Sequence, residues 1–312
     1  MSTKQRVLLT GATGFVGTHA HESLLNHGFE VHGVTSQTPP DVSSNDAMVW
    51  HQCDLLDHDA ASKLVRKVGA THLLHLAWYV QPGKLITADE NFDWVAASLN
   101  LVRSFREHGG QRVVCSGSCY EYDWNYGYCS EKTTPTTPDT VYGACKNALR
   151  ELLEIYCRQH GIGFGWGRVF FLYGPHENPN RLVSSVTRSM LEGREAKSSH
   201  GRQIRDYAHV GDVAQGLVAL LQSDYDGALN IATGQAMQIR DIVTHIADIT
   251  DRASLLKLGA LPARANDLPL VVADTTLANE TLDWRPKFEL RSGLEDTVQW
   301  WQLQTAANEG NS

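Results

Sequence analysis

No apolar stretch in this 312-residue sequence approaches the ~18 residues that a membrane-spanning helix needs, which argues against a transmembrane protein. Cysteine is scarce, and the six cysteines show neither the spacing of a disulfide framework nor that of a zinc site. We therefore expect free thiols, no bound metal and a cytoplasmic location. Positive charge is also in deficit: 27 Lys and Arg against 35 Asp and Glu give a net charge of −8, which argues against nucleic acid or a membrane as partner.

A glycine-rich turn near the amino terminus is the first positive feature. The apolar run Arg6–Thr10 leads into Gly11-Ala-Thr-Gly14-Phe-Val-Gly17, and a helical pattern continues to Gly28. The first glycine permits a tight turn, the second lets the backbone approach a pyrophosphate, and the third lets helix and strand pack closely. The amides of residues 15 and 16 then point toward phosphates from a helix amino terminus. This segment predicts the start of a dinucleotide-binding βαβ unit.

Strands and helices alternate from this turn to residue 170, which predicts an α/β fold with a doubly wound parallel sheet. Residues 171–312 are predicted to form a smaller C-terminal α/β lobe that binds the substrate, with 211–232 returning to the main sheet. The predicted strands are Arg6–Thr10, Glu30–Thr35, Met48–Cys53, His72–Ala77, Arg112–Ser116, Gly163–Phe170, Leu229–Ile231 and Leu270–Ala273. The predicted helices are Phe15–His27, Ala60–Val68, Glu90–His108, Tyr142–His160, Arg181–Glu192, Gly211–Gln222 and Ile239–Thr250.

A candidate acid/base group lies in the middle of the chain. Tyr142 and Lys146 are one turn apart on one face of a predicted helix, and Ser118 follows an apolar run. Lowering the pKa of a phenol from about 10 to neutral pH takes about 4 kcal/mol. A fixed ammonium group and a cationic nicotinamide ring are a plausible source of that energy. The alternative interpretation, a surface Tyr and Lys on an amphipathic helix, becomes less attractive beside the glycine turn.

Together these motifs resemble the extended short-chain dehydrogenase/reductase family, in its nucleotide-sugar epimerase, dehydratase and reductase branch. The spacing is that family's G-x-x-G-x-x-G, and the resemblance extends from Arg6 to about Trp300. It implies a Rossmann sheet, bound NAD(P) and a catalytic set of Ser118, Tyr142 and Lys146. The positions it assigns to the cofactor are Gly11, Thr13, Gly14, Phe15, Val16, Gly17, Thr35, Ser36, Asp54, Leu55, Leu76, Ala77, Trp78, Ser116, Tyr142, Lys146 and Val169.

The end of the second strand bears on the identity of the cofactor. An acid there would bind the adenosine ribose of NAD, and an arginine would accept the phosphate of NADP. This chain has Thr35 and Ser36 there, with no acid before Asp41 and no arginine. The two hydroxyls can donate to a 2′-phosphate, so we expect NADP(H) in preference to NAD(H).

The segment around Ser118 distinguishes reaction types. The family's 4,6-dehydratases carry an Asp-Glu pair directly after this hydroxyl, and here those places hold Cys119 and Tyr120. A dehydratase is therefore not expected. Glu121 is one position further on and, by strand alternation, is expected to face away as a surface or structural carboxylate.

The C-terminal lobe offers groups for a nucleoside diphosphate. Arg205 lies in a segment that resembles the family's R-D-x-x-H-V-x-D, in which the arginine meets a phosphate; the alternative is an ion pair with Asp206 or Asp212. Phe171 stands where the family commonly has an asparagine, which favours apolar contact with a deoxy sugar or a place in the core. The full set expected at the substrate is Trp78, Ser118, Cys119, Tyr120, Phe171, Arg181, Arg205, Arg264 and Asp267.

These observations favour a nucleoside-diphosphate 4-keto-6-deoxyhexose 4-ketoreductase that uses NAD(P)H. In this hypothesis Tyr142 protonates the oxygen, Lys146 holds the nicotinamide ribose and Ser118 polarises the carbonyl. The first alternative is an NAD-dependent 4-epimerase, and the second is a non-catalytic NADP sensor, which the intact Ser-Tyr-Lys set disfavours. The resemblance also implies a homodimer formed through the helices near 90–108 and 142–160.

Overall fold

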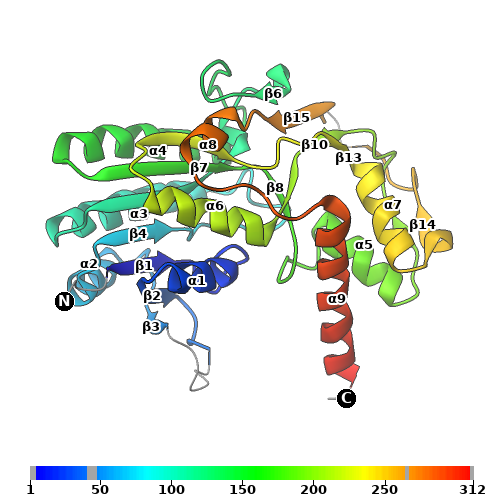
Figure 1. Ribbon diagram of the computed structural model, residues 1–312, viewed down its shortest axis with the longest axis horizontal. Helices are drawn as coiled ribbons and strands as arrows, with labels where there is room; N and C mark the ends of the chain where they lie inside the picture. The colour runs from blue at the N-terminus through cyan, green and yellow to red at the C-terminus, as the bar shows by residue number, and fades with distance from the viewer. Residues whose placement is uncertain (1–4, 41–47, 264–266, 310–312) are drawn as a thin grey trace.

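The computed structural model describes residues 5–40, 48–263 and 267–309, with side chains described to residue 306. Its centre is a seven-stranded sheet in the order β12-β7-β5-β4-β1-β2-β3, and every pairing in it is parallel (Figure 1). The strands are β1 (Arg6–Thr10), β2 (Glu30–Thr35), β3 (Val49–Gln52), β4 (His72–His75), β5 (Arg112–Ser118), β7 (Gly163–Val169) and β12 (Gly227–Ile231).

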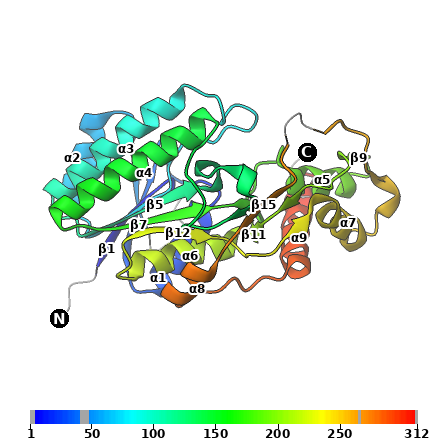
Figure 2. The ribbon, with the colours of Figure 1, turned by 90° about the horizontal axis from the view of Figure 1, so that it is seen from above.

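Helices cover both faces of this sheet, as Figure 2 shows from above. One face carries α2 (His58–Val68), α3 (Glu90–Glu107) and α4 (Val141–His160), and the other carries α1 (Gly17–Asn26), α6 (Val210–Gln222) and α8 (Thr276–Thr281). Each layer has its own apolar core against the sheet. Because both faces are covered, the central strands read as continuous apolar runs: the side chains of Val7, Leu8 and Leu9 are all 0% exposed.

A smaller lobe follows β8 (Phe171–Tyr173) and packs around a separate apolar cluster. Three helices supply most of that cluster: α5 (Leu182–Leu191), α7 (Ile239–Ile249) and α9 (Leu290–Glu309). A four-stranded sheet contains β13 (Met237–Gln238), β10 (Ile204–Arg205), β15 (Leu270–Ala273) and β6 (Tyr128–Cys129), while β8 pairs with β11 (Tyr207–His209) and β9 (Ala196–Lys197) with β14 (Leu256–Lys257).

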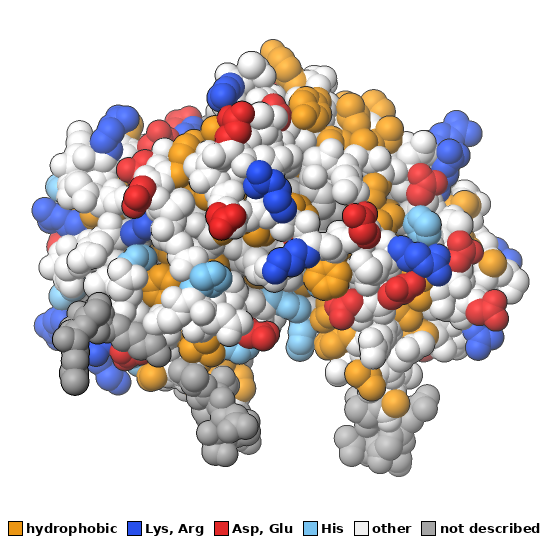
Figure 3. Space-filling view, in the orientation of Figure 1, with side chains coloured by type: hydrophobic (Ala, Val, Ile, Leu, Met, Phe, Trp, Pro, Cys, Tyr) orange, Lys and Arg blue, Asp and Glu red, His pale blue; other side chains and the backbone are white. Residues whose placement is uncertain are grey.

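The surface of the molecule carries mixed charge. On the face in Figure 3, Lys and Arg side chains are interspersed with Asp and Glu, and a notch separates the Rossmann half from α9. Within the described ranges, no helix has the length and apolar content to cross a bilayer. Nor do the described residues contain a group of three or more His, Cys, Asp or Glu that could hold a metal ion.

The predicted fold class is confirmed: the sheet is parallel, doubly wound and flanked by helices on both faces. In the structure α6 packs against the sheet and β12 pairs with β7. The division of the chain at residues 170 and 171 stays a prediction. The helix α9 and the short strands β6, β8 and β11 were not predicted from the sequence.

Candidate active site

The glycine turn lies at the carboxyl end of β1 and is shaped for close approach. Gly11 has φ +67°, and a Cβ added there would come within 2.9 Å of the backbone nitrogen of Ala77. A Cβ on Gly17 would lie 2.0 Å from the carbonyl oxygen of Gly11, so the start of α1 is pressed against the turn. Only glycine fits at both places, which leaves an open backbone cradle at a helix amino terminus. The turn therefore fits the pyrophosphate of a dinucleotide.

The residues at the ends of β2 and β3 differ in their exposure. The Thr35 side chain is buried, its hydroxyl lies 3.3 Å from that of Thr13, and it accepts a hydrogen bond from the amide of Gln37. Ser36 and Asp54 are exposed, while Leu55 is part of the core. Of the two hydroxyls expected to bind a 2′-phosphate, that of Thr35 is thus already engaged within the turn. Asp41 lies outside the described residues.

Ser118 and Tyr142 are brought together by the end of β5 and the start of α4. Thr140 caps α4 by accepting from the amide of Gly143 at 3.1 Å. A Cβ on Gly143 would lie 2.1 Å from the carbonyl oxygen of Tyr120, so this glycine lets the helix approach the turn after Ser118. The Ser118 side chain lies close enough to the Tyr142 phenol for a hydrogen bond that lowers the pKa of this phenol, against the larger effect of burial. The structure therefore brings the hydroxyl and the phenol together.

Lys146 completes this group from the next turn of α4. Its ammonium donates to the carbonyl oxygen of Ser116 at 2.9 Å and lies 3.8 Å from the ring centre of Trp78. The side chain is 3% exposed, and burial lowers its pKa to about 8, against the nearby Cys115 and Glu121, which raise the pKa. The Trp78 indole is itself fixed by donating to Asn91 at 2.8 Å.

The pKa of Tyr142 differs from the expectation. Burial raises it above the ordinary value of a phenol, and the hydrogen bond with Ser118 opposes this only in part. The ammonium of Lys146 lies against the Ser116 carbonyl and the Trp78 ring. Burial, and not this charge, determines the direction in which the pKa of Tyr142 shifts. The chain by itself thus keeps Tyr142 as a neutral phenol, which is a proton donor.

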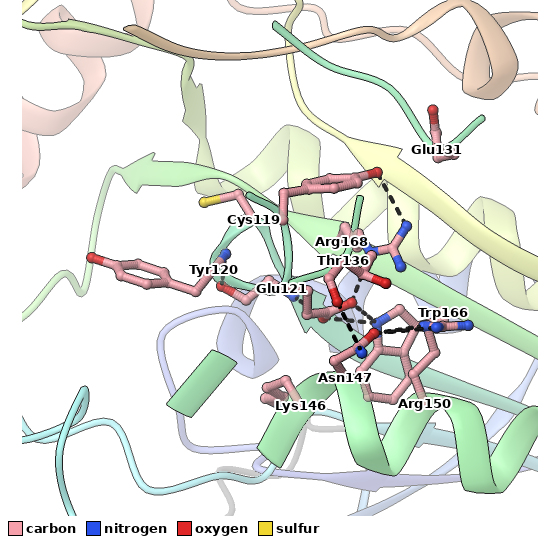
Figure 4. Close-up of polar contacts among 12 residues, drawn as sticks. Cys119, Tyr120, Glu121, Glu131, Thr136, Lys146, Asn147, Arg150, Trp166 and Arg168 are labelled. Carbon is pink, nitrogen blue, oxygen red and sulfur yellow. Dashed lines mark hydrogen bonds and ion pairs between the residues drawn. The ribbon is translucent and has the colours of Figure 1, made fainter. Parts of the chain in front are cut away.

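Glu121 is a structural carboxylate, and the part of the expectation that placed it at the surface is wrong. It is 0% exposed and forms an ion pair with Arg168 at 2.7 Å. The indole of Trp166 and the amide of Ser118 also donate to it, at 2.9 and 2.7 Å. Figure 4 shows Glu121, Trp166 and Arg168 converging, while Tyr120 points the other way. Glu121 is therefore buried within this network and is not exposed to solvent.

Aromatic side chains extend from the Tyr142 phenol into the smaller lobe. The ring of Tyr120 lies 5.7 Å from that of Tyr142 and 4.4 Å from that of Trp124. Phe171 follows, 6.0 Å from Trp124 and 5.5 Å from Tyr207. All four rings beyond the buried phenol are partly exposed. We call Tyr120, Trp124, Phe171 and Tyr207 the aromatic wall; Trp124 and Tyr207 were not predicted, because nothing in their local sequence marks them as neighbours.

Arg205 leads from the aromatic wall to polar groups of the lobe. Its guanidinium lies 5.6 Å from the ring centre of Phe171 and forms an ion pair with Asp267. Gln203 donates to the other oxygen of Asp267 at 2.7 Å. Both predicted binders, Arg205 and Asp267, are therefore together, and the ion pair is with Asp267 instead of Asp206 or Asp212.

The remaining predicted substrate residues differ in their exposure. Arg181 is exposed at the start of α5. Burial raises the pKa of Tyr207, and the nearby Arg181 is one of the charges that partly oppose this rise. The structure disagrees with the expectation at Cys119, which is 2% exposed and packs in an apolar cluster with Tyr122 and Phe170. Its burial follows from the turn after β5, which points the thiol inward. Arg264 lies outside the described residues.

Comparisons with known proteins show which family and which proteins this chain is similar to. A family model described as "NAD dependent epimerase/dehydratase family" matches residues 7–232. UDP-glucuronate 4-epimerase 4 of Arabidopsis thaliana is 26% identical over 333 residues, which cover 95% of this chain and 75% of that protein. UDP-glucose 4-epimerase of Streptomyces lividans is 25% identical over 319 residues, which cover 95% of each.

The fold of this chain is also similar to that of a solved structure. The structure of MoeE5 in complex with UDP-glucuronic acid and NAD superposes with a TM-score of 0.82 at 28% identity. The match covers 96% of this chain and 99% of MoeE5. The similarity thus includes the Rossmann sheet and the smaller lobe.

Proposed function

Because this chain belongs to the NAD-dependent epimerase/dehydratase family, we propose that it is an NAD-dependent 4-epimerase of a UDP-hexopyranose. The observation that supports this proposal is the clustering of Ser118, Tyr142 and Lys146 at the end of β5 and the start of α4. The epimerases among its relatives favour this reaction over the 4-ketoreductase that the sequence favoured.

The proposed chemistry assigns one task to each of the three side chains. The Tyr142 phenol exchanges a proton with the oxygen on carbon 4 of the sugar, and the Ser118 hydroxyl hydrogen-bonds the same oxygen. Lys146, four residues further along α4, supplies a positive charge near the phenol during the proton transfer. When bound, NAD supplies the acceptor and donor of the hydride at carbon 4. For inversion at carbon 4 without net oxidation, the site would have to hold the 4-keto form with either face toward the hydride that NAD would supply.

We propose NAD as the cofactor in place of the expected NADP. The residues that would hold it are the glycine turn, the ends of β2 and β4, and Lys146. The engagement of the Thr35 hydroxyl with Thr13 removes one donor for a 2′-phosphate, and MoeE5 was solved with NAD. A cofactor that is regenerated in each turnover has no need to leave.

The decisive experiment identifies the co-purifying dinucleotide by mass spectrometry and follows UDP-glucose and UDP-glucuronic acid by NMR. We expect stoichiometric NAD and slow equilibration of a UDP-sugar with its 4-epimer, without added cofactor. Binding of cofactor without conversion of any sugar in a broad panel would instead indicate a sensor.

A 4-ketoreductase remains the second candidate, and the aromatic wall is the observation that favours it. Phe171 offers an apolar surface where a sugar hydroxyl would find no partner, and a 6-deoxy sugar suits that surface better. Stoichiometric consumption of NADPH with a 4-keto-6-deoxy nucleotide sugar, and no epimerisation, is the result that would select this function.

We further propose that Arg205 and Asp267 bind the nucleoside diphosphate, with Arg181 beside them. A guanidinium already oriented by a carboxylate is well placed for a phosphate. Arg205→Ala is expected to raise the KM for the UDP-sugar by about tenfold or more, since a charge-assisted hydrogen bond contributes about 1.5–3 kcal/mol. Dinucleotide content should stay unchanged.

The control for this prediction is Arg202→Ala, which removes an exposed arginine of the same segment. Steady-state kinetics and ultraviolet spectra of both variants provide the comparison. Equal loss of sugar binding and dinucleotide in Arg205→Ala would mean that the arginine only supports the fold.

We also propose a cytoplasmic homodimer that forms through α3 and α4. The two helices carry exposed apolar side chains: Phe92 is 59% exposed, and Leu152 and Ile155, on one face of α4, are 52% and 48% exposed. All six cysteines are free, as a reducing cytosol allows. Leu152→Glu with Ile155→Glu is expected to give monomers in sedimentation, whereas Leu303→Glu on α9 should leave the dimer intact.

A further inference from the structure

A buried carboxylate lies directly behind the catalytic hydroxyl. Glu121 is fully buried, and its two oxygens accept four hydrogen bonds from three groups. Oε1 accepts from the amide of Ser118 at 2.7 Å and from the indole of Trp166 at 2.9 Å. Oε2 accepts from the same indole at 3.0 Å and from Nε of Arg168 at 2.7 Å. The carboxylate is thus saturated with donors, one of which is the backbone of the residue that carries the hydroxyl.

The connection to Ser118 is local and rigid. Residues 118–121 form a capping box: the Ser118 hydroxyl accepts from the amide of Tyr120 at 3.3 Å, and Glu121 reaches back to the amide of Ser118. A Cβ on Gly117 would lie 2.1 Å from the indole nitrogen of Trp166, so the end of β5 is packed against this network. Glu121 therefore controls where β5 ends and how Ser118 is presented.

Stability alone is a weak reason to bury this ion pair. Apolar side chains of similar size in place of a buried pair are often neutral or stabilising, because desolvation offsets the attraction between the charges. Arg168 is nevertheless held twice more, by its bond to the Tyr122 hydroxyl at 3.1 Å and by the ring of the same residue at 4.6 Å. Tyr122 in turn donates to Asn230 at 2.9 Å. The whole network is connected, and it reaches the reaction centre through the hydrogen bond to the Ser118 amide. Its charge also acts on Lys146, whose pKa Glu121 raises against the larger effect of burial.

We propose that Glu121 is a positioning residue, which holds the backbone of Ser118 so that its hydroxyl stays on the phenol of Tyr142. This inference rests on the proposed function, because it assigns a task within the same site. Hydrogen-bonding groups aimed at a reacting oxygen act well only when supporting contacts fix them within about 0.5 Å. Arg168 and Trp166 are the supports that orient the carboxylate.

The test compares two double variants that both remove the ion pair: Glu121→Gln with Arg168→Gln, called the Gln pair, and Glu121→Met with Arg168→Met, called the Met pair. In Glu121→Gln with Arg168→Gln, the amide oxygen of Gln can still accept from Ser118, and its amide group can donate to the new Gln at 168. In Glu121→Met with Arg168→Met, the shape of Glu121 is approximated but nothing accepts from Ser118. We expect kcat near that of the parent for the first variant, and about a hundredfold lower for the second. KM for the sugar and dinucleotide content should be unchanged in both.

A cycle with Ser118→Ala separates positioning from general support of the fold. Once the hydroxyl is absent, the Met pair should lower kcat no further, because Glu121 acts through that hydroxyl. Additive losses, or equal kcat in the two double variants, would overturn the inference while leaving the proposed epimerase intact. If the Met pair does not fold, Glu121→Asp withdraws the carboxylate from Ser118 while keeping the charge; it should lower kcat with KM unchanged, and an unchanged kcat would overturn the inference.

Crystal structures provide a readout that needs no turnover. The Ser118 hydroxyl should contact Tyr142 in the Gln pair and leave it in the Met pair. A hydroxyl that keeps its place in both variants contradicts the inference, whatever reaction the chain catalyses. Failure of the parent to convert any nucleotide sugar contradicts the proposed function alone.

Discussion

Tyr142→Phe is expected to lower turnover by about a thousandfold, the range over which a positioned acid/base group acts. The phenol is the buried partner of Ser118, so its loss leaves no side-chain donor of comparable position on α4. The ring remains and continues to pack against Tyr120 and Trp78 at the observed spacing. Dinucleotide content and thermal unfolding should therefore change little. The measurement is kcat for the UDP-sugar, beside the absorbance of the bound dinucleotide.

Tyr126→Phe is the matched control, because it removes a phenol that is 56% exposed in the turn Trp124–Tyr126. It should leave kcat unchanged. Full activity of Tyr142→Phe would remove the phenol from the mechanism. Loss of the dinucleotide together with turnover would mean that Tyr142 helps to hold the cofactor. Single-turnover measurements with added NAD then separate a role in cofactor binding from a role in proton transfer.

Most of the sheet could be predicted because each central strand is buried on both faces. Arg6–Thr10 was predicted with its observed bounds, since the continuous apolar run of this strand ends at the glycine turn. The glycine turn was equally readable, because its residue type is dictated by φ and by close backbone contacts. In the smaller lobe β15 was predicted, but the other strands carry two or three residues each, too few for a period to be recognised.

Glu121 shows why part of the site could not be predicted. Strand alternation was extended past Ser118, but β5 ends there and a 3-10 turn, Cys119–Glu121, begins. In that turn the carboxylate folds back on the amide of Ser118, and its partners Trp166 and Arg168 come from a strand 45 and 47 residues later. Arg205 likewise pairs with Asp267, a contact that no local pattern announces.

The second large effect concerns Lys146, whose replacement by methionine should abolish most turnover and yet stabilise the fold. Loss of its charge behind Tyr142 is expected to lower kcat by about a hundredfold or more. The opposite effect on stability follows from burial, which lowers the pKa of the folded lysine from 10.5 to about 8. The difference between these values corresponds to about 3 kcal/mol of cost to the folded state. The lost hydrogen bond to Ser116 offsets about 1 kcal/mol of the gain.

The stability difference between Lys146→Met and the parent depends on pH. Below pH 8 the lysine is protonated in both the folded and the unfolded chain, so the full cost is present. Between pH 8 and 10.5 the unfolded chain binds more protons, and the stability contributed by Lys146 rises with pH until the cost is gone. Lys146→Met should therefore unfold at higher denaturant concentration than the parent at pH 7, by about 2 kcal/mol, and lose this advantage by about pH 10.5.

Lys63→Met provides the matched control, because Lys63 is exposed on α2 and its replacement should alter neither kcat nor the pH profile of stability. Urea unfolding of all three proteins between pH 7 and pH 10 makes the comparison. A Lys146→Met protein that is less stable than the parent at pH 7 would mean that the bonds to Ser116 and Trp78 outweigh the desolvation of the ammonium. In that case Lys146 would stabilise the fold. A gain in stability with a loss of turnover would instead indicate that the charge serves the reaction and lowers the stability of the fold.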